Sequence, residues 1–210
     1  MTRRLAIAAL AALVFLSAAV AVAAGATKSA DRGFTVWLQT FASPALDQVA
    51  NLNTLVGQST VNAALMLVLM AVLFVRGPRW AWIAPLFLGL LTVVELAGKL
   101  SLVHPSPPDE FIRTSFNPLG IHLSTSSSFP SGHVSRVTFF AILLWELIPN
   151  AVVRTLLVAL AIATPFLRIY LGDHWISDTV GGVSLGILCG TLAVQWLAAT
   201  RRRAAAARAR

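Results

Sequence analysis

Between two long apolar stretches, the chain reads Arg168-Ile169-Tyr170-Leu171-Gly172-Asp173-His174-Trp175-Ile176-Ser177-Asp178. A second polar segment borders another apolar stretch and reads Phe129-Pro130-Ser131-Gly132-His133. A lone lysine, Lys99, ends a third apolar stretch. Ionisable side chains at such places are costly to insert into a bilayer and are usually functional. The polar segments therefore mark the candidate site, and the apolar stretches beside them indicate the fold.

The composition indicates a single membrane domain. Of the 210 residues, 57% are hydrophobic and only 11% are charged, far from an ordinary soluble domain. The net charge of +8 would suggest nucleic acid in a soluble protein. Here the arginines gather at the ends of apolar stretches, so we interpret them as bilayer orientation signals and expect no nucleic-acid partner. Cys189 is the only cysteine, which excludes an intramolecular disulfide and a zinc cluster of cysteines.

Six stretches approach the roughly 20 apolar residues that a helix needs to cross a bilayer. The predicted spans are residues 5–25, 59–75, 80–98, 134–149, 152–171 and 175–198. We therefore expect an all-α fold, a six-transmembrane-helix bundle in one domain over residues 1–210. Its catalytic helical core is expected at residues 59–198.

The positive charges predict how this bundle is inserted. If six helices alternate, ten of the arginines fall on one side, which the positive-inside rule makes the cytoplasm. They are Arg3, Arg4, Arg76, Arg79, Arg154, Arg201, Arg202, Arg203, Arg208 and Arg210. The expected protein is a multi-pass cell-membrane protein with both termini in the cytoplasm and a basic cytoplasmic tail at residues 199–210. Lys99, His133, Arg168 and His174 then lie at the extracytoplasmic face.

The N-terminal part leaves alternatives open. Residues 1–26 have the pattern of a first transmembrane helix and also resemble a cleavable signal peptide, with Arg3-Arg4 before an apolar core. In the next segment, residues 27–58, apolar side chains recur at helical spacing around Pro44. This favours one or two short helices lying in the membrane interface. A packed lid helix explains the same pattern.

The Pro130-Ser131-Gly132-His133 segment precedes a predicted helix. Glycine allows close approach of a ligand to the backbone, and free N–H groups at a helix start bind anions. His133 is then placed to give a proton to a departing oxygen. On its own, the same segment could be a loop turn with a surface histidine.

The second histidine has a carboxylate four residues later. On one helix His174 and Asp178 would share a face. The aspartate could keep one imidazole nitrogen protonated and leave the other free to attack. Taken alone, this pair could equally be a helix-capping ion pair. Three polar clusters at one membrane face together favour the catalytic interpretation.

The order of Lys99, Pro130-Ser131-Gly132-His133 and Arg168-x5-His174-x3-Asp178 resembles the type 2 phosphatidic acid phosphatase family over roughly residues 40–198. The resemblance implies metal-independent hydrolysis of a phosphomonoester or diphosphate, without a cofactor, at the outer rim of a helical bundle. The implied substrate is a phosphorylated lipid, such as phosphatidic acid, phosphatidylglycerophosphate or a polyprenyl diphosphate. By the same resemblance, His174 is the nucleophile, Asp178 its orienting partner and His133 the general acid. The implied phosphate ligands are Lys99, Ser131, Gly132 and Arg168.

The chain departs from the family pattern beside Lys99. The motif arginine is replaced by Ser106, which removes a bidentate clamp on an anion that lysine does not copy. Two auxiliary phosphate ligands are candidates to compensate: His104 in the same loop, and Arg136 one helical turn after His133. Glu95 is expected to pair with Lys99, and Arg113 is interpreted as a solvated loop charge.

Three functions are compatible with these residues: a lipid phosphatase, a phosphotransferase that passes the phosphoryl group to another hydroxyl, and a non-catalytic lipid-binding or transport relative. The short motifs do not name the lipid, because selectivity depends on the shape of the helix-lined site. They also leave the oligomeric state open.

Overall fold

The computed structural model describes residues 3–113 and 127–209, and within these ranges regular structure is helical apart from one isolated bridge between His104 and Ser127. The elements are α1 (Arg3–Ala23), α2 (Lys28–Gln39), α3 (Pro44–Val56), α4 (Ser59–Arg76), the 3₁₀ helix η1 (Ala81–Leu86), α5 (Phe87–Ser101), the 3₁₀ helix η2 (Asp109–Phe111), α6 (Gly132–Leu147), α7 (Ala151–Tyr170) and α8 (Ile176–Arg208). The all-α prediction is confirmed.

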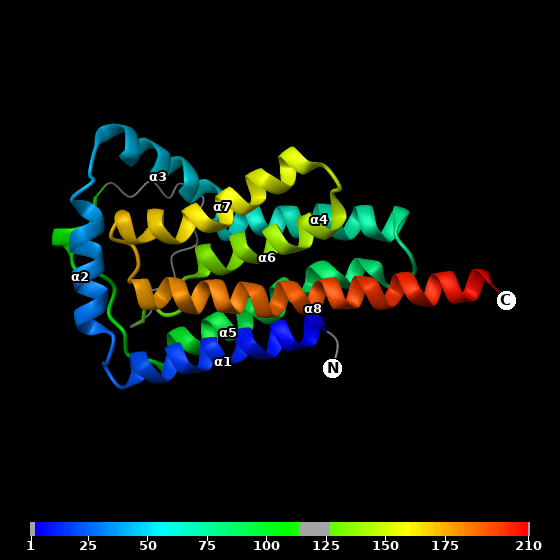
Figure 1. The fold of residues 1–210 in the computed structure, drawn as a ribbon, viewed down its shortest axis with the longest axis horizontal. Helices are drawn as coiled ribbons and strands as arrows, with labels where there is room; N and C mark the ends of the chain where they lie inside the picture. Colours follow the sequence, from blue (N-terminus) through cyan, green and yellow to red (C-terminus); the bar gives the residue numbers. More distant parts are fainter. Residues whose placement is uncertain (1–2, 114–126, 210) are drawn as a thin grey trace.

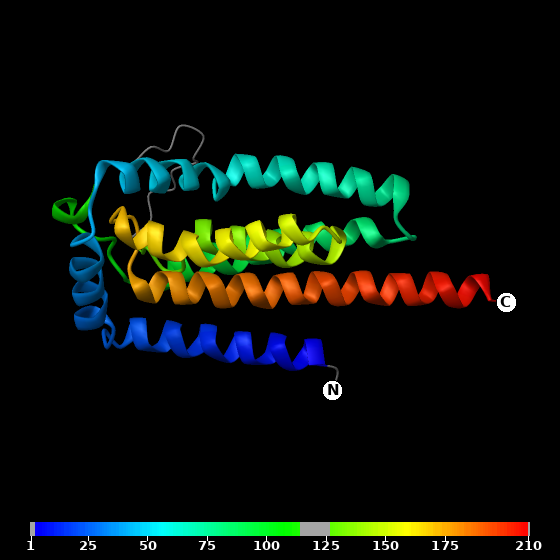
Figure 2. The ribbon, with the colours of Figure 1, turned by 45° about the horizontal axis from the view of Figure 1, so that its top comes forward.

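The long helices form a bundle around α8, and α2 lies across one end of it (Figures 1 and 2). Helices α1 and α6 make the most extensive contacts with α8. The two chain ends lie toward the end of the bundle that is opposite α2 (Figure 1). The C-terminal ends of α5 and α7, and the start of α6, meet at the α2 end (Figure 1). All three predicted polar clusters therefore lie at the same end of the bundle.

Five of the described helices are long and apolar enough to cross a membrane: α1, α4, η1 with α5, α7 and α8. The remaining predicted span, residues 134–149, corresponds to α6, which has only 16 residues. At 1.5 Å per residue, α6 is about 24 Å long, less than the roughly 30 Å hydrocarbon core of a bilayer. The predicted count of six transmembrane helices is therefore not confirmed by helix length.

Helix α6 is short but is enclosed by its neighbours, with ten of its residues buried. Gly182, Gly186 and Gly190 of α8 face it at successive turns, and a Cβ at each would press on atoms of α6 or of its N-cap Ser131, as far along as Ile142. Small residues at this spacing let two helix backbones approach closely within a membrane. This contact holds the start of α6 beside the start of α8.

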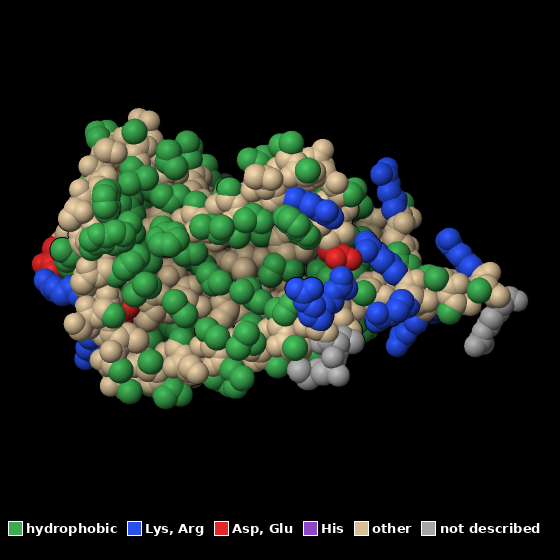
Figure 3. Space-filling view, viewed as in Figure 1, with side chains coloured by type: hydrophobic (Ala, Val, Ile, Leu, Met, Phe, Trp, Pro, Cys, Tyr) green, Lys and Arg blue, Asp and Glu red, His purple; other side chains and the backbone are tan. Residues whose placement is uncertain are grey.

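Helix α8 continues ten residues beyond the predicted span, to Arg208. The segment predicted as a separate basic tail is thus the end of a helix of 33 residues. Arginines gather at this end of the molecule (Figure 3). Arg4 and Arg201 both pair there with Glu146, at 3.2 and 3.0 Å.

The segment at residues 27–58 forms two helices, as expected, separated by a turn at Ser43. The Ser43 side chain accepts a hydrogen bond from the Leu46 amide, and Pro44 occupies the first turn of α3. Arg113 is not a solvated charge, because it makes two hydrogen bonds to Asp47 of α3, at 2.9 and 3.1 Å. Together with the Tyr170 hydroxyl, this guanidinium lowers the pKa of the Asp47 carboxyl to about 2.

Candidate active site

The candidate nucleophile and its partner lie where α8 begins. His174 ends the turn after α7, and Asp178 is in the first turn of α8. The carboxylate oxygen Oδ2 of Asp178 accepts a hydrogen bond from the Trp175 amide at 2.9 Å and lies 3.3 Å from Nδ1 of His174. A carboxylate at this place favours the proton on Nδ1 and leaves Nε2 unprotonated. Asp178 thus caps the helix and also contacts the imidazole, so one carboxylate makes the contacts that both sequence interpretations require.

The imidazole of His174 is buried, and this affects its protonation. Burial lowers the pKa of His174, while Asp178 acts in the opposite direction. Removing a group from water disfavours its charged form. His174 is therefore held in the neutral form, which is the form that can attack.

Cationic side chains surround His133. Lys99, Arg136 and Arg168 all lie within electrostatic range of its imidazole, and so does His174. Arg168 is anchored by Nη1 donating to Thr54 at 2.8 Å and by Nη2 at 3.0 Å from Asp173. Lys99 Nζ donates to the backbone oxygen of Ser128 at 3.3 Å. Such a concentration of positive charge is suited to an anion.

The turn formed by Ser131 and Gly132 is hydrogen-bonded to the start of α8. The Ser131 amide donates to the backbone oxygen of Asp178 at 3.0 Å. Gly132 lies so close to the Glu95 carboxylate and the Arg136 guanidinium that a side chain there would collide with both. A side chain at position 132 would therefore displace the ends of both partners in this ion pair.

Four buried side-chain atoms at this site lack a hydrogen-bond partner among the described residues. They are Ser131 Oγ, His133 Nε2, Arg168 Nε and Asp178 Oδ1. Buried polar atoms are normally satisfied, so unpaired ones require an explanation. Three of the four belong to groups that can donate to a phosphate oxygen, which is consistent with a site built for an anion.

The two candidate auxiliary ligands are placed differently from each other. Arg136 is buried, pairs with Glu95 at 2.8 Å and donates to the Gly57 oxygen at 3.1 Å, while its Nη2 lies beside Gly132. Glu95 thus pairs with Arg136, not with Lys99 as expected. His104 contacts Ser177, at 3.1 Å, and the Asp178 carboxylate, at 3.5 Å. The phosphate role predicted for His104 has no support from these contacts.

Several residues of the site gave no signal in the sequence. Thr54 anchors Arg168, Gly57 lies against His133, and Asp31 bonds to Ser177 although 146 residues separate them. Each acts through a contact between distant segments, which no local motif records. Among the described residues, no group of three His, Cys, Asp or Glu side chains is arranged as a metal site.

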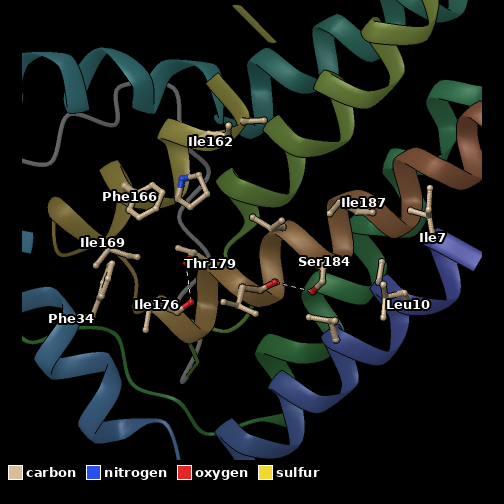
Figure 4. A pocket seen from close by; sticks show the side chains of 16 residues that line it. Ile7, Leu10, Phe34, Ile162, Phe166, Ile169, Ile176, Thr179, Ser184 and Ile187 are labelled. Atoms are coloured by element: carbon tan, nitrogen blue, oxygen red, sulfur yellow. Dashed lines mark hydrogen bonds between the residues drawn. The ribbon is translucent and has the colours of Figure 1, made fainter. Parts of the chain in front are cut away.

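An apolar cavity of about 560 Å³ lies between α1, α7 and α8, with Phe34 of α2 at one end (Figure 4). Its only hydroxyl-bearing side chains, Thr179 and Ser184, donate to backbone oxygens of their own helix, so the wall offers no free donor. Ile176, two residues after His174, is part of the lining. The cavity suits hydrocarbon.

Comparison with known proteins places this geometry in context. The chain is 29% identical over 187 residues to phosphatidylglycerophosphatase B of Bacillus subtilis (strain 168), covering 84% of this chain and 87% of that protein. Over a shorter stretch of 81 residues it is 33% identical to the putative undecaprenyl-diphosphatase YbjG of Escherichia coli (strain K12), covering 37% of this chain and 39% of that one.

Solved structures agree with these relatives. The crystal structure of a transmembrane PAP2-type phosphatidylglycerolphosphate phosphatase from Bacillus subtilis superposes with a TM-score of 0.72 at 25% identity, over 93% of this chain and 96% of that chain. LpxE of Aquifex aeolicus shares the fold, with a TM-score of 0.60 at 22% identity over 79% of this chain and 94% of its own. Residues 6–202, almost the whole chain, match the PAP2 superfamily. The protein is therefore a member of the PAP2 superfamily.

Proposed function

We propose that this protein hydrolyses the phosphomonoester or diphosphate of a membrane lipid through a phosphohistidine at His174. The observation that carries the proposal is the buried pairing of His174 with Asp178, close to His133, Lys99 and Arg168. A neutral, oriented imidazole beside fixed cations is what phosphoryl transfer to histidine requires. Membership of the PAP2 superfamily supports the same reaction.

In the first step, Nε2 of His174 attacks phosphorus and the bond to the lipid oxygen breaks. His133 enters the step as the imidazolium, a form that the negative charge of the bound phosphate favours, and gives its proton to that departing oxygen, while Lys99, Arg168 and the Ser131–Gly132 turn hold the phosphoryl oxygens. In the second step, water attacks the phosphohistidine, the P–N bond breaks and inorganic phosphate leaves. His133 takes the proton from the water, so both histidines return to their starting forms.

We also propose the membrane arrangement that the charges predict. The site lies at the extracytoplasmic face and both termini lie in the cytoplasm. Helix α6 is the sixth span, and it crosses the membrane surrounded by the other helices. Retention of α1 is supported by its packing along α8 and by the ring contact of Phe15 with Phe129, whose centroids are 5.7 Å apart. Residues 27–58 lie in the membrane interface. Trp37 and Phe41 of this segment are exposed, and their aromatic rings would lie at the level of the lipid headgroups.

Phosphatidylglycerophosphate is the leading substrate candidate, because the relative that matches most of the chain carries that activity in its name. A polyprenyl diphosphate is the second candidate, from the shorter match. The apolar cavity that reaches Ile176 provides room for hydrocarbon near His174 in either case.

The test is phosphate release by the purified protein in detergent, measured as kcat/KM for phosphatidylglycerophosphate, phosphatidic acid and undecaprenyl diphosphate. We expect release from at least one of them, with His174→Ala as the matched blank. Release that requires an added alcohol acceptor would instead indicate a phosphotransferase. No release from any lipid would indicate a binding protein and contradict the proposal.

A further inference from the structure

A second buried carboxylate lies behind Asp178, on a different helix. Asp31 of α2 is only 1% exposed and His104, in the loop after α5, is 6% exposed. Together with Ser177 they form a connected group that ends at the catalytic aspartate. Asp178 Oδ2 faces His174, whereas Oδ1 faces this group.

The hydrogen-bond directions in this group are determined. Ser177 donates its amide to Asp31 Oδ1 and its hydroxyl to Asp31 Oδ2, both at 3.0 Å. Since the single hydroxyl proton is given to Asp31, the Ser177 oxygen can only accept from a further partner. Nε2 of His104 lies 3.1 Å from that oxygen. The proton of the His104 imidazole must therefore be on Nε2.

That proton also faces the catalytic carboxylate. Nε2 of His104 is 3.5 Å from Asp178 Oδ1 and 3.8 Å from Asp31 Oδ2. Asp178 Oδ2 is already used by the Trp175 amide and His174, whereas Oδ1 is buried with no hydrogen bond in the described part of the chain. A small movement of either side chain would turn the 3.5 Å contact into a hydrogen bond.

We propose that His104 and Asp31 are positioning residues for the nucleophile, acting through Asp178. In this role the His104 N–H is shared between Ser177 Oγ and Asp178 Oδ1, which keeps Oδ2 directed at His174, and Asp31 holds Ser177 in place. His104 then supports the aspartate and does not bind phosphate. The inference rests on the proposed phosphohistidine reaction, and it ties that reaction to α2, a helix outside the motif region.

The first test varies the donor at position 104. His104→Leu removes the N–H, whereas His104→Gln keeps an amide donor at similar reach and His104→Asn keeps one that is too short. We expect kcat to fall about 10- to 100-fold in His104→Leu and His104→Asn, as is typical when the support of a catalytic group is lost. KM should stay within about twofold, because the phosphate ligands are untouched. His104→Gln should retain most of the activity.

Asp31→Asn should give an intermediate loss of kcat. The matched control is Arg32→Gln, on the adjacent residue, which breaks an exposed ion pair to Glu110 at 3.2 Å and a cation–π contact with Phe111. Elution as a single detergent complex and an unchanged melting temperature establish folding. If His104→Leu does not fold, the comparison of His104→Gln with His104→Asn is used instead, and the proposal requires a higher kcat for His104→Gln.

The second test repeats His104→Leu in an Asp178→Asn background. A residue that acts through Asp178 should cost little once the carboxylate is gone, less than about threefold. A loss as large as in the wild type would show direct action on phosphate and overturn the proposal. So would a raised KM at unchanged kcat, or equal rates for the Gln and Asn variants. Wild-type phosphate release relative to His174→Ala tests the proposed function separately, so the two failures appear in different measurements.

Discussion

Gly57, in the turn between α3 and α4, lies directly against the imidazole of His133. A Cβ at position 57 would come within 2.5 Å of Cδ2 and 2.8 Å of Cβ of this histidine. Because the clash includes the Cβ of His133, rotation of the ring cannot relieve it. The position of the proposed general acid therefore depends on the absence of a side chain from another segment of the chain.

Replacing Gly57 by alanine should displace His133 and reduce kcat by about 10²- to 10⁴-fold, the usual contribution of a general acid. The measurement is steady-state phosphate release. Gly89→Ala is the control, since nothing lies within 4 Å of a Cβ there. Full activity in Gly57→Ala would contradict this, because it would show that His133 can move away from position 57 without losing its function.

His174→Ala should abolish turnover, because no other group forms the covalent intermediate. Quenching the wild type with labelled substrate should trap an acid-labile phosphoprotein that His174→Ala lacks. Asp178→Asn should still be labelled, but slowly, because the amide stabilises the wrong imidazole tautomer. Equal labelling of wild type and His174→Ala would refute the assignment of the nucleophile.

The lowered pKa of His174 predicts the acid limb of the pH profile. A lower pKa leaves more of the imidazole neutral at any acidic pH, so kcat/KM should stay high below about pH 6.5, the value for an ordinary histidine. Asp178 raises this pKa, so Asp178→Asn should move the acid limb to still lower pH while reducing the maximum. Comparing both proteins on one lipid removes the titration of the substrate itself. An acid limb that moves to higher pH in Asp178→Asn would contradict this.

Activity should survive a strong chelator without added magnesium, because Lys99 and Arg168 supply the charge stabilisation that a metal would otherwise give. The measurement is the rate before and after incubation with chelator. Loss of the rate on chelation, with recovery on adding magnesium, would count against the mechanism.

Arg136→Ala should reduce kcat/KM nearly as much as Arg168→Ala, for two reasons that can be separated. It leaves Glu95 buried without its partner, and breaking a buried pair costs about 3–5 kcal/mol of stability. It also removes the Nη2 that lies beside Gly132. The double variant Glu95→Gln/Arg136→Gln removes the stranded charge, so a folded but slow double variant would show that Arg136 acts on phosphate.

Ser106→Arg restores the motif arginine that this chain lacks, and so tests whether Arg136 already takes its place. It should help little in the wild type, where Arg136 is present. If Ser106→Arg instead raises kcat/KM severalfold, the motif arginine has no substitute in this protein, and Arg136 serves mainly to hold Glu95.

The sequence was sufficient for the all-helical class, for most helix ends and for the gathering of Lys99, His133 and His174 at one end. These depend on hydropathy and on chain direction, which are local or nearly local properties. The span predicted at residues 134–149 has the same 16 residues as α6 but lies two positions too far along the chain, because Ile148 and Pro149 extend the apolar stretch while the helix runs from Gly132 to Leu147.

The pairing of charged side chains was predicted less well. Glu95 lies one turn from Lys99, so helical spacing favoured that pair, but the structure gives Glu95 to Arg136, 41 residues away. The place of His104 in a motif loop predicts a phosphate ligand, and no motif marks Asp31. Which of several partners a buried charge selects depends on packing between helices, which spacing along one helix does not contain.

The packing of α1 along α8 has a consequence for how the protein is made. Helix α1 leaves the ribosome well before α8, its principal partner, and the proposed nucleophile His174 directly precedes α8. During synthesis α1 must therefore remain in the bilayer without its principal partner until α8 has been inserted. A prematurely terminated chain lacking α8 would have neither a nucleophile nor a partner for its first helix, so membrane quality-control proteases should find it an easy target.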